Sequence, residues 1–241
     1  MDKKAIIIGA TSGIGRELVK ELAKDGYEIA ITGRRTELLD NLKQELTGHT
    51  IHVQQMDVQC LDESRAQMQT LADKMGGLDL VVYNSGVGDI STRWDLEQAI
   101  LQTNAVGFAA IANWSYAYFA QQGSGHLVGI SSVAGTRGGG RSPMYHATKA
   151  FMSNYLEGLY YRSRRKKMGI AVTDIKPGFV DTPMTARNNF PMPWMATSEK
   201  AAAQIYRAIK QKRKSAYITR RWLLAAWLMR LMPNFVYEKI A

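Results

Sequence analysis

Short apolar runs alternate with longer helical patterns along most of this 241-residue chain. The runs are rich in Ile and Val, and two of the helical segments between them, residues 15–26 and 35–48, end at a glycine. Such alternation is typical of a parallel sheet with helices on both faces. We therefore expect an α/β, doubly wound Rossmann fold of about seven strands, at residues 4–9, 28–33, 51–56, 79–84, 126–131, 170–176 and 216–219.

No linker rich in Pro, Ser or Gly and no internal repeat interrupts this alternation, so one Rossmann-type domain over residues 1–219 is the simplest prediction. Two segments depart from the pattern. Residues 182–197 contain three prolines without a clear period, which predicts a loop covering the active site. Residues 220–241 are apolar and basic and predict a C-terminal helical extension.

The chain is basic, with a net charge of +10 concentrated at residues 160–167 and 210–214. Such a surface attracts nucleic acid, anionic lipid or phosphate-bearing ligands without choosing among them. The basic runs lack interleaved aromatic residues and match no nucleic-acid-binding module, so no nucleic-acid partner is predicted. The four histidines and Cys60 show no metal-ligand spacing, and no metal site is predicted.

A single cysteine, Cys60, excludes an internal disulfide and fits a reducing compartment. No apolar stretch reaches the roughly 20 residues that a membrane-spanning helix needs. We therefore expect a cytoplasmic protein.

Three glycines, Gly9, Gly13 and Gly15, separate the first predicted strand from the first predicted helix. A tight turn here lets the backbone approach a phosphate, and the amides at the helix N-terminus offer donors and the positive end of the helix dipole. The spacing G-x-x-x-G-x-G differs from the commoner G-x-G-x-x-G. Its place between strand and helix still favours dinucleotide binding over an ordinary glycine-rich turn.

The end of the second strand indicates which dinucleotide is bound. NAD-binding folds place an acidic residue about 20 residues beyond the glycines, on the ribose hydroxyls. This chain has Arg34 and Arg35 there instead. A carboxylate would repel a 2′-phosphate, whereas a guanidinium can bind one. NADP(H) is therefore predicted over NAD(H), the alternative being two surface arginines that only open a helix.

A tyrosine and a lysine lie four residues apart in "SPMYHATKA", residues 142–150. Ser142 and Pro143 are typical of a helix start, because the missing N–H of proline costs nothing in the first turn. Tyr145 and Lys149 would then share one helix face, with Cβ atoms roughly 5–6 Å apart. Any amphipathic helix offers such a pair, so the spacing alone does not identify a site.

In order along the chain, the glycine pattern, "YNSG" at residues 83–86, the pair Ser131–Ser132 and Tyr-x-x-x-Lys resemble the short-chain dehydrogenase/reductase family. The resemblance is to its single-domain branch and spans about residues 4–218. Ile8-Gly9 stands where the family usually has Thr-Gly, and "YNSG" where it has Asn-Asn-Ala-Gly. The resemblance implies an NAD(P)-dependent oxidoreductase that interconverts a carbonyl and an alcohol as a homodimer or homotetramer.

The resemblance also implies a role for each matching residue. Tyr145 is the implied acid/base, Ser132 would hold the substrate carbonyl, and Lys149 would bind the nicotinamide ribose. Asn104, in "QTNAVG", would help to link the lysine to solvent through a water. With Tyr145 and Lys149, the predicted cofactor-binding residues are Gly9, Thr11, Ser12, Gly13, Ile14, Gly15, Arg34, Arg35, Asp57, Val58, Asn84, Gly86, Pro177, Gly178, Val180 and Thr182.

Elementary chemistry supports these roles. A free tyrosine has a pKa of about 10, too high for efficient proton transfer near neutral pH. An ammonium within roughly 4–6 Å favours tyrosinate, so Lys149 and an oxidised nicotinamide are expected to lower the pKa of Tyr145. A serine hydroxyl stabilises the carbonyl oxygen as negative charge grows on it.

The substrate and the tail are less constrained. Apolar residues of the 182–197 loop would line a pocket for a hydrophobic ketone or alcohol, or would pack the loop onto its own domain: Phe190, Met192, Trp194 and Met195. Tail residues predict an apolar helix face, namely Trp222, Leu223, Leu224, Trp227, Leu228, Leu231 and Met232. That face would cover the pocket, form an oligomer contact or lie in a bilayer interface beside basic residues. Packing on the protein itself is favoured, because apolar stripes usually face a core.

The favoured function is an NADP(H)-dependent oxidoreductase acting on a small carbonyl or alcohol, with Tyr145 as acid/base. Peripheral membrane contact through residues 220–241 is kept as an alternative. The competing function is a catalytically silent NADP(H)-binding regulator or membrane-associated sensor. The presence together of all four implied catalytic residues argues against it, because a sensor needs no proton donor: Asn104, Ser132, Tyr145 and Lys149.

Overall fold

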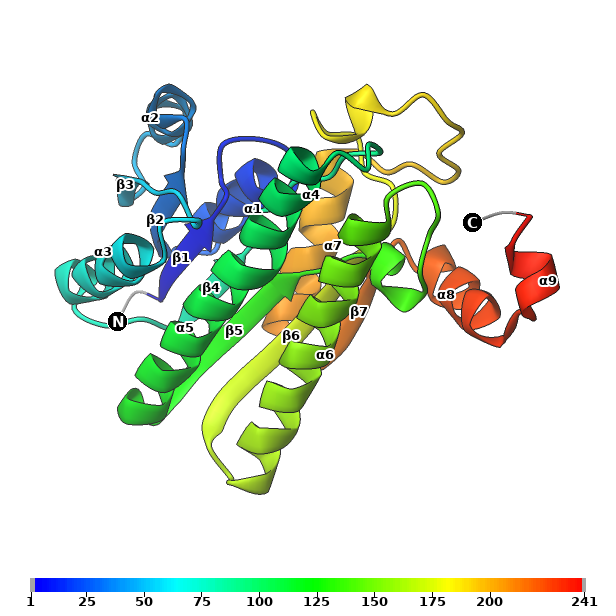
Figure 1. Cartoon of the computed structure of the whole chain (residues 1–241). Helices are drawn as coiled ribbons and strands as arrows, with labels where there is room; N and C mark the ends of the chain where they lie inside the picture. Colours follow the sequence, from blue (N-terminus) through cyan, green and yellow to red (C-terminus); the bar gives the residue numbers. More distant parts are fainter. Residues whose placement is uncertain (1–2, 240–241) are drawn as a thin grey trace.

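A seven-stranded parallel sheet forms the centre of the molecule (Figure 1). The computed structural model describes residues 3–239 apart from the side chain of Arg187, so residues 1–2 and 240–241 of the predicted ranges lie outside the described residues. The spatial order is β3-β2-β1-β4-β5-β6-β7, and every neighbouring pair is parallel. The strands are β1 (Lys4–Ile8), β2 (Glu28–Gly33), β3 (Ile51–Gln55), β4 (Leu80–Tyr83), β5 (Ser124–Ile130), β6 (Gly169–Pro177) and β7 (Ser215–Ile218).

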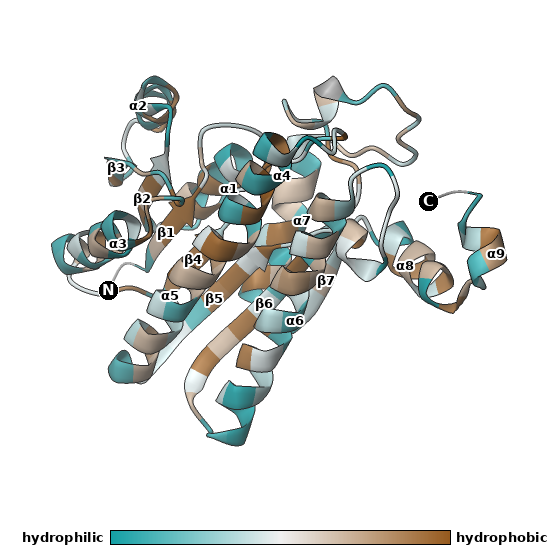
Figure 2. Ribbon diagram, viewed as in Figure 1, coloured by the Kyte–Doolittle hydropathy of each residue, from teal (hydrophilic) through white to brown (hydrophobic). Residues whose placement is uncertain are grey.

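Helices cover both faces of this sheet, because its strands are apolar on both sides (Figure 2). In β1, Ala5 and Ile7 belong to one buried cluster, while Ile6 and Ile8 belong to the other. The first cluster includes residues of α1 (Gly13–Lys24), α2 (Thr36–Glu45) and α7 (Ser198–Lys210). The second includes residues of α3 (Leu61–Met75), α5 (Phe108–Gln122) and α6 (Pro143–Arg165). The predicted doubly wound α/β fold is confirmed.

The strand order reverses between β1 and β4, which are neighbours in the sheet although two strands separate them in sequence. In open α/β sheets, ligands bind outside the carboxyl ends of the strands at such a switch point. The segments that leave β1 and β4 there are residues 9–12 and 84–93, the latter leading into α4 (Trp94–Leu101) and the π-helical turn η1 (Gln102–Gly107). The fold therefore places the predicted glycine motif and "YNSG" at one crevice.

Residues 182–197 form a loop with one short 3-10 turn, η3 (Thr185–Arg187), as the sequence predicts. A single β-bridge between Val180 and Ala196 closes the base of this loop. In Figure 1 the loop is the yellow segment above the carboxyl ends of the strands. It therefore lies where a substrate loop is expected.

After β7 the chain forms α8 (Arg221–Leu231) and α9 (Asn234–Tyr237), beyond the β7 edge of the sheet (Figure 1). We call these two helices the C-terminal hairpin. Its predicted apolar face does not pack against the protein, and in this respect the sequence-based interpretation is wrong. Of the seven predicted residues, Trp222 and Met232 are half-buried, while five are exposed: Leu223, Leu224, Trp227, Leu228 and Leu231. Within residues 3–239, no helix is both long and apolar enough to cross a membrane.

Candidate active site

The loop between β1 and α1 is built around close backbone approaches. Gly9 and Gly13 have φ angles of +87° and +56°, a region that favours glycine. A Cβ atom on Gly15 would lie 2.2 Å from the carbonyl oxygen of Gly9. The amide of Asn84 donates a hydrogen bond of 2.7 Å to that same oxygen, tying the segment after β4 to the loop. Larger residues would therefore fill or distort this cradle.

The N-terminus of α1 offers its amides to a ligand. Ser12 occupies the N-cap position but its side chain accepts no capping hydrogen bond, and the first turn contains no acidic residue. The first amides of a helix have no partner within the helix, and they lie at the positive end of its dipole. This end of α1 therefore suits an anion, and the cradle above it fits the pyrophosphate of a dinucleotide.

Arg35 lies across the same loop. Its guanidinium donates hydrogen bonds to the hydroxyl oxygens of Thr11, at 2.8 Å, and Ser12, at 3.3 Å. Arg34 and Arg35 are both exposed, and both line the cavity that begins at the glycine loop. The structure thus brings two cations to the end of the cavity beside the glycine loop.

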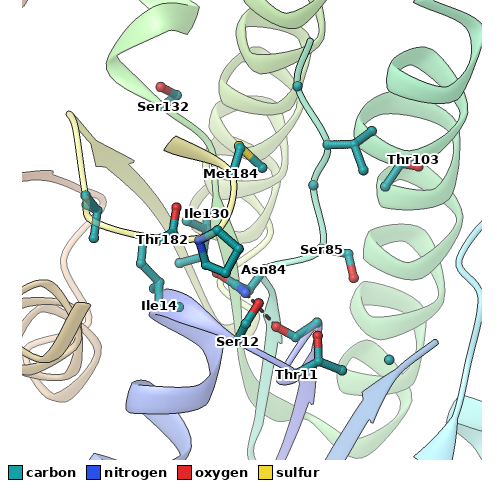
Figure 3. Close-up of a pocket in the computed structure, with 18 of the residues that line it drawn as sticks. Thr11, Ser12, Ile14, Asn84, Ser85, Thr103, Ile130, Ser132, Thr182 and Met184 are labelled. Atoms are coloured by element: carbon teal, nitrogen blue, oxygen red, sulfur yellow. Dashed lines mark hydrogen bonds between the residues drawn. The ribbon is translucent and has the colours of Figure 1, made fainter. Parts of the chain in front are cut away.

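One cavity of about 520 Å³ joins the glycine loop to the predicted catalytic residues. Figure 3 shows Thr11 and Ser12 at one end of it and Ser132 and Met184 at the other. Of the predicted catalytic and cofactor-binding residues, all but Gly15 and Asn104 line this cavity.

Sequence reasoning missed several lining residues, among them Met56, Ser85, Val87, Gly88, Thr103, Ile130, Met184 and Thr185. Met56 directly follows β3, and Ile130 is the last residue of β5. The carboxyl ends of parallel strands meet at one edge of the sheet. Residues at or directly after the end of a predicted strand could therefore have been recognised as candidates for the site.

Lys149 is buried beneath Tyr145 on α6. Its side chain is only 4% exposed, and Nζ donates a hydrogen bond of 3.0 Å to the carbonyl of Ile130. Nζ lies 5.7 Å from the centre of the Tyr145 ring. Burial lowers the pKa of Lys149 to about 8, with the carboxylate of Asp174 opposing this change. The lysine is therefore poised to change charge near neutral pH.

The pKa of Tyr145 is raised, whereas the sequence predicts a lowered value. Burial of the phenol raises its pKa, and a hydrogen bond with Ser132 acts in the opposite direction without cancelling it. In the absence of a nicotinamide, whose positive charge was part of the expected lowering, removing the phenol from water outweighs the effect of its neighbours. Tyr145 is therefore held in its protonated form.

Asn104 supports the cavity from behind. It lies in η1, the π-helical turn, a kind of irregularity that is frequent at functional sites. Its side chain accepts a hydrogen bond from the backbone N–H of Val87 at 2.9 Å and donates one to the carbonyl of Val87 at 2.8 Å. Asn104 thus holds the segment after β4, which lines the cavity beside Lys149.

The 182–197 loop contributes other residues to the cavity than we expected. Pro183, Met184 and Thr185 line it. Phe190 instead packs edge-on against Phe179, with ring centres 6.1 Å apart. Trp194 does the same against Trp222 of α8, at 5.4 Å. Phe190 and Trp194 therefore pack the loop onto its own protein, which was the second alternative left open by the sequence, whereas Met195 is exposed.

A family model for short chain dehydrogenases matches residues 3–192. The chain belongs to this family. An uncharacterized oxidoreductase of Myxococcus xanthus is 35% identical over 247 residues, covering 99% of this chain and 96% of the relative. Another, of Mycobacterium tuberculosis, is 32% identical over 239 residues, covering 95% of this chain and 92% of the relative. This short-chain dehydrogenase is accordingly an oxidoreductase acting on CH–OH and C=O groups.

Solved structures share its fold. A short-chain dehydrogenase/reductase of Burkholderia phymatum, in complex with NAD, matches with a TM-score of 0.87 at 20% identity and covers 95% of this chain and 92% of that one. One of Sphingobium yanoikuyae, in complex with NADPH, has a TM-score of 0.81 at 21% identity, covering 96% and 97%. At these identities the likeness establishes the fold alone.

Proposed function

We propose that this short-chain dehydrogenase interconverts a hydrophobic ketone and its alcohol with NADP(H), using Tyr145 as the acid/base. The observation that carries the proposal is the single cavity shared by Ser132, Tyr145, Lys149 and the glycine loop. A cofactor bound along that cavity would extend from the amides of α1 to the buried lysine. The predicted cofactor-binding residues and their roles, Asp57 toward adenine and Val180 and Thr182 around the nicotinamide among them, belong to this proposal.

In the reduction direction, the bound nicotinamide supplies the hydride. The Ser132 hydroxyl donates to the carbonyl oxygen of the substrate, where negative charge develops. Tyr145 is protonated, because its pKa is raised by burial, and it delivers its phenolic proton to that oxygen. The ammonium of Lys149 stabilises the tyrosinate that remains. In oxidation the same groups act in reverse, with tyrosinate accepting the proton of the alcohol.

The preference for NADP(H) rests on Arg34 and Arg35. Both side chains line the cavity, and Arg35 already lies on the loop that would hold the phosphates. Replacing Arg35 with aspartate would place a carboxylate there, which repels a 2′-phosphate and accepts hydrogen bonds from free ribose hydroxyls. We expect Arg35→Asp to weaken NADPH binding at least about tenfold relative to NADH, because charge-assisted hydrogen bonds contribute roughly 1.5–3 kcal/mol. Unchanged discrimination would contradict the assignment.

The first test is NADPH oxidation, followed by absorbance, across a panel of ketones, aldehydes and quinones. NADH is measured in parallel, and Tyr145→Phe is the matched control because it removes only the hydroxyl. Turnover that prefers NADPH and collapses in the variant supports the proposal. Equal turnover by both proteins would show that the proton comes from elsewhere.

The second candidate function, a silent NADP(H)-binding regulator, makes the opposite prediction. It requires tight NADPH binding without turnover of any panel compound by either protein. The presence of Ser132 and Tyr145 beside Lys149 in one cavity speaks against it, because a protein that only binds NADP(H) needs no proton donor.

We also propose peripheral membrane contact through the C-terminal hairpin. Residues 220–239 contain four basic residues against the single acid Glu238, beside an exposed apolar face. Exposed Trp and Leu next to Arg are typical of helices that lie in an anionic bilayer interface. Trp227→Ser should reduce co-sedimentation with anionic vesicles, while Trp94→Ser, an equally exposed tryptophan elsewhere, should not. Equal partitioning of both variants would refute this contact.

A homodimer or homotetramer and a cytoplasmic location remain predictions of the family resemblance and of the single cysteine. Light scattering at several protein concentrations tests the first. A mass that stays at 26.9 kDa would contradict it.

A further inference from the structure

The C-terminal hairpin is attached to the segment that connects the two proposed catalytic residues, Ser132 and Tyr145. Arg137 extends from this segment and donates hydrogen bonds to two backbone carbonyls at the end of α8, those of Met229, at 2.8 Å, and Met232, at 2.6 Å. A third bond, of 2.5 Å, goes to the side chain of Asn234 at the start of α9. One guanidinium thus joins the turn between both helices to the segment that follows Ser132.

Tyr237 of α9 completes this attachment. Its ring lies beneath the guanidinium of Arg137, 3.9 Å from Cζ. Its hydroxyl donates a hydrogen bond of 2.7 Å to the carbonyl of Gly138. Cation–π contact and hydrogen bonding therefore act on two successive residues of the same segment.

The inner side of the segment is attached to α6. The Nδ1 atom of His146, the residue after Tyr145, lies 2.8 Å from the carbonyl oxygen of Arg137. A carbonyl only accepts, so Nδ1 carries the proton and donates it. A Cβ atom on Gly139 would lie 2.3 Å from the His146 ring, so the backbone passes directly over it. The segment is thereby held between the hairpin and the start of the helix that carries Tyr145.

The other end of α8 contacts the segment that follows β6. The indole of Trp222 lies so close to Gly178 that a Cβ atom there would meet Nε1 at 1.9 Å. Gly178 follows Pro177, whose carbonyl accepts a hydrogen bond of 3.4 Å from the Ser132 hydroxyl. The hairpin therefore contacts two segments near the serine: Gly178, through Trp222, and the segment that follows Ser132, through Arg137.

We propose that Arg137 is a positioning residue that fixes Ser132 and Tyr145 by fastening the C-terminal hairpin onto residues 132–139. The last carbonyls of a helix have no partner within the helix, and a cation is favoured at the negative end of its dipole. Arg137 supplies both the donors and the charge: its Nη1 donates to both carbonyls, and its Nη2, the other arm of the planar fork, donates to Asn234. This inference rests on the proposed function of Ser132 and Tyr145.

Arg137→Met should lower kcat about tenfold or more, because a displacement of roughly 1 Å at reacting groups costs up to about 100-fold in rate. The dissociation constant of NADPH should stay unchanged, since none of residues 137–142 lines the cavity. Arg137→Lys keeps the charge but not the fork, and should fall between the variant and the wild type. Tyr237→Phe, which removes one hydrogen bond, should have a smaller effect than Arg137→Met.

Hydrogen exchange of residues 132–146 gives a readout independent of turnover, and should become faster in Arg137→Met. Arg164→Met is the matched control: Arg164 is exposed in the last turn of α6, at the end remote from Tyr145, and should change neither quantity.

The proposal is overturned if Arg137→Met keeps kcat within about twofold, or if exchange of residues 132–146 is unchanged. It is also overturned if NADPH affinity falls together with kcat, because the residue would then hold up the whole fold rather than the catalytic segment. If the wild type turns over no carbonyl compound, the proposed function fails, while the exchange measurement still decides whether Arg137 fixes residues 132–146.

Discussion

Replacing Lys149 with methionine should make the protein more stable below pH 8 while removing its activity. Burial lowers the pKa of Lys149 from 10.5 to about 8, a difference worth about 3 kcal/mol of free energy. Methionine fills similar space without a charge, so this cost disappears. The variant also loses the hydrogen bond from Nζ to the carbonyl of Ile130, worth about 1 kcal/mol. The net gain below pH 8 should be about 2 kcal/mol.

The sign of this effect changes with pH. Between about 8 and 10.5 the unfolded lysine holds its proton and the folded one does not, so the free energy of unfolding of the wild type rises with pH in that window. The variant has no such group. Its advantage should therefore be largest below pH 8 and should vanish by pH 10.5, where the lost hydrogen bond leaves it less stable by about 1 kcal/mol.

Urea denaturation followed by tryptophan fluorescence, below pH 8 and above pH 10.5, measures both differences. Lys176→Met is the matched control, because Lys176 is paired with the buried carboxylate of Asp174. Removing that partner deprives the buried carboxylate of its ion pair, although the Ser131 hydroxyl still donates to it, so the control should be destabilised below pH 8. A Lys149→Met variant that is less stable than the wild type below pH 8 would refute the reasoning, and one that still oxidises NADPH would refute the assigned role.

Three further outcomes are expected, two for the candidate site and one for a histidine buried in the sheet. The value of kcat/KM for NADPH should fall as the pH rises through about 8, because Lys149 then loses its proton. In a pH–rate profile of Lys149→Arg, this fall should occur at a higher pH. Burial lowers the pKa of His126 to about 3, so below pH 6.5 the unfolded chain takes up a proton there that the folded protein does not. The free energy of unfolding, measured by urea titration, should therefore fall on acidification, and it should fall less steeply in His126→Gln. Asn104→Ala removes both hydrogen bonds to the backbone of Val87 and should displace the segment beside Lys149. Steady-state assays should then show kcat lowered about tenfold. Unchanged values would contradict each.

Most of the fold could be predicted because its strands are buried on both faces. A strand such as β1, with four consecutive buried residues from Ala5 to Ile8, is visible as a continuous apolar run. The helix ends were visible where a local signal exists, as at Pro143, which opens α6. Such information is carried by residues close together in sequence, and local patterns retain it.

The candidate site could be located because its residues occur at fixed spacings from strand ends and within one helix. The pKa values of its residues could not be predicted, because they depend on burial. The sequence predicts a lowered pKa for Tyr145 from the nearby ammonium, whereas the folded protein buries both groups, raising the pKa of the phenol and lowering that of Lys149. Desolvation is a property of everything packed around a group, and no spacing between two residues contains it.

The packing of the C-terminal hairpin could not be predicted from local sequence patterns either. Its apolar residues suggest a helix face packed on the protein, yet the residues that attach it are an arginine, a tyrosine and one inward-facing tryptophan. Arg137 and Asn234 are 97 positions apart, so nothing local links them. Because polar contacts fasten the hairpin, its leucines remain free to face a different environment. The helix is thus fastened by its ends beside the proposed catalytic serine, while its exposed leucines contribute nothing to that attachment.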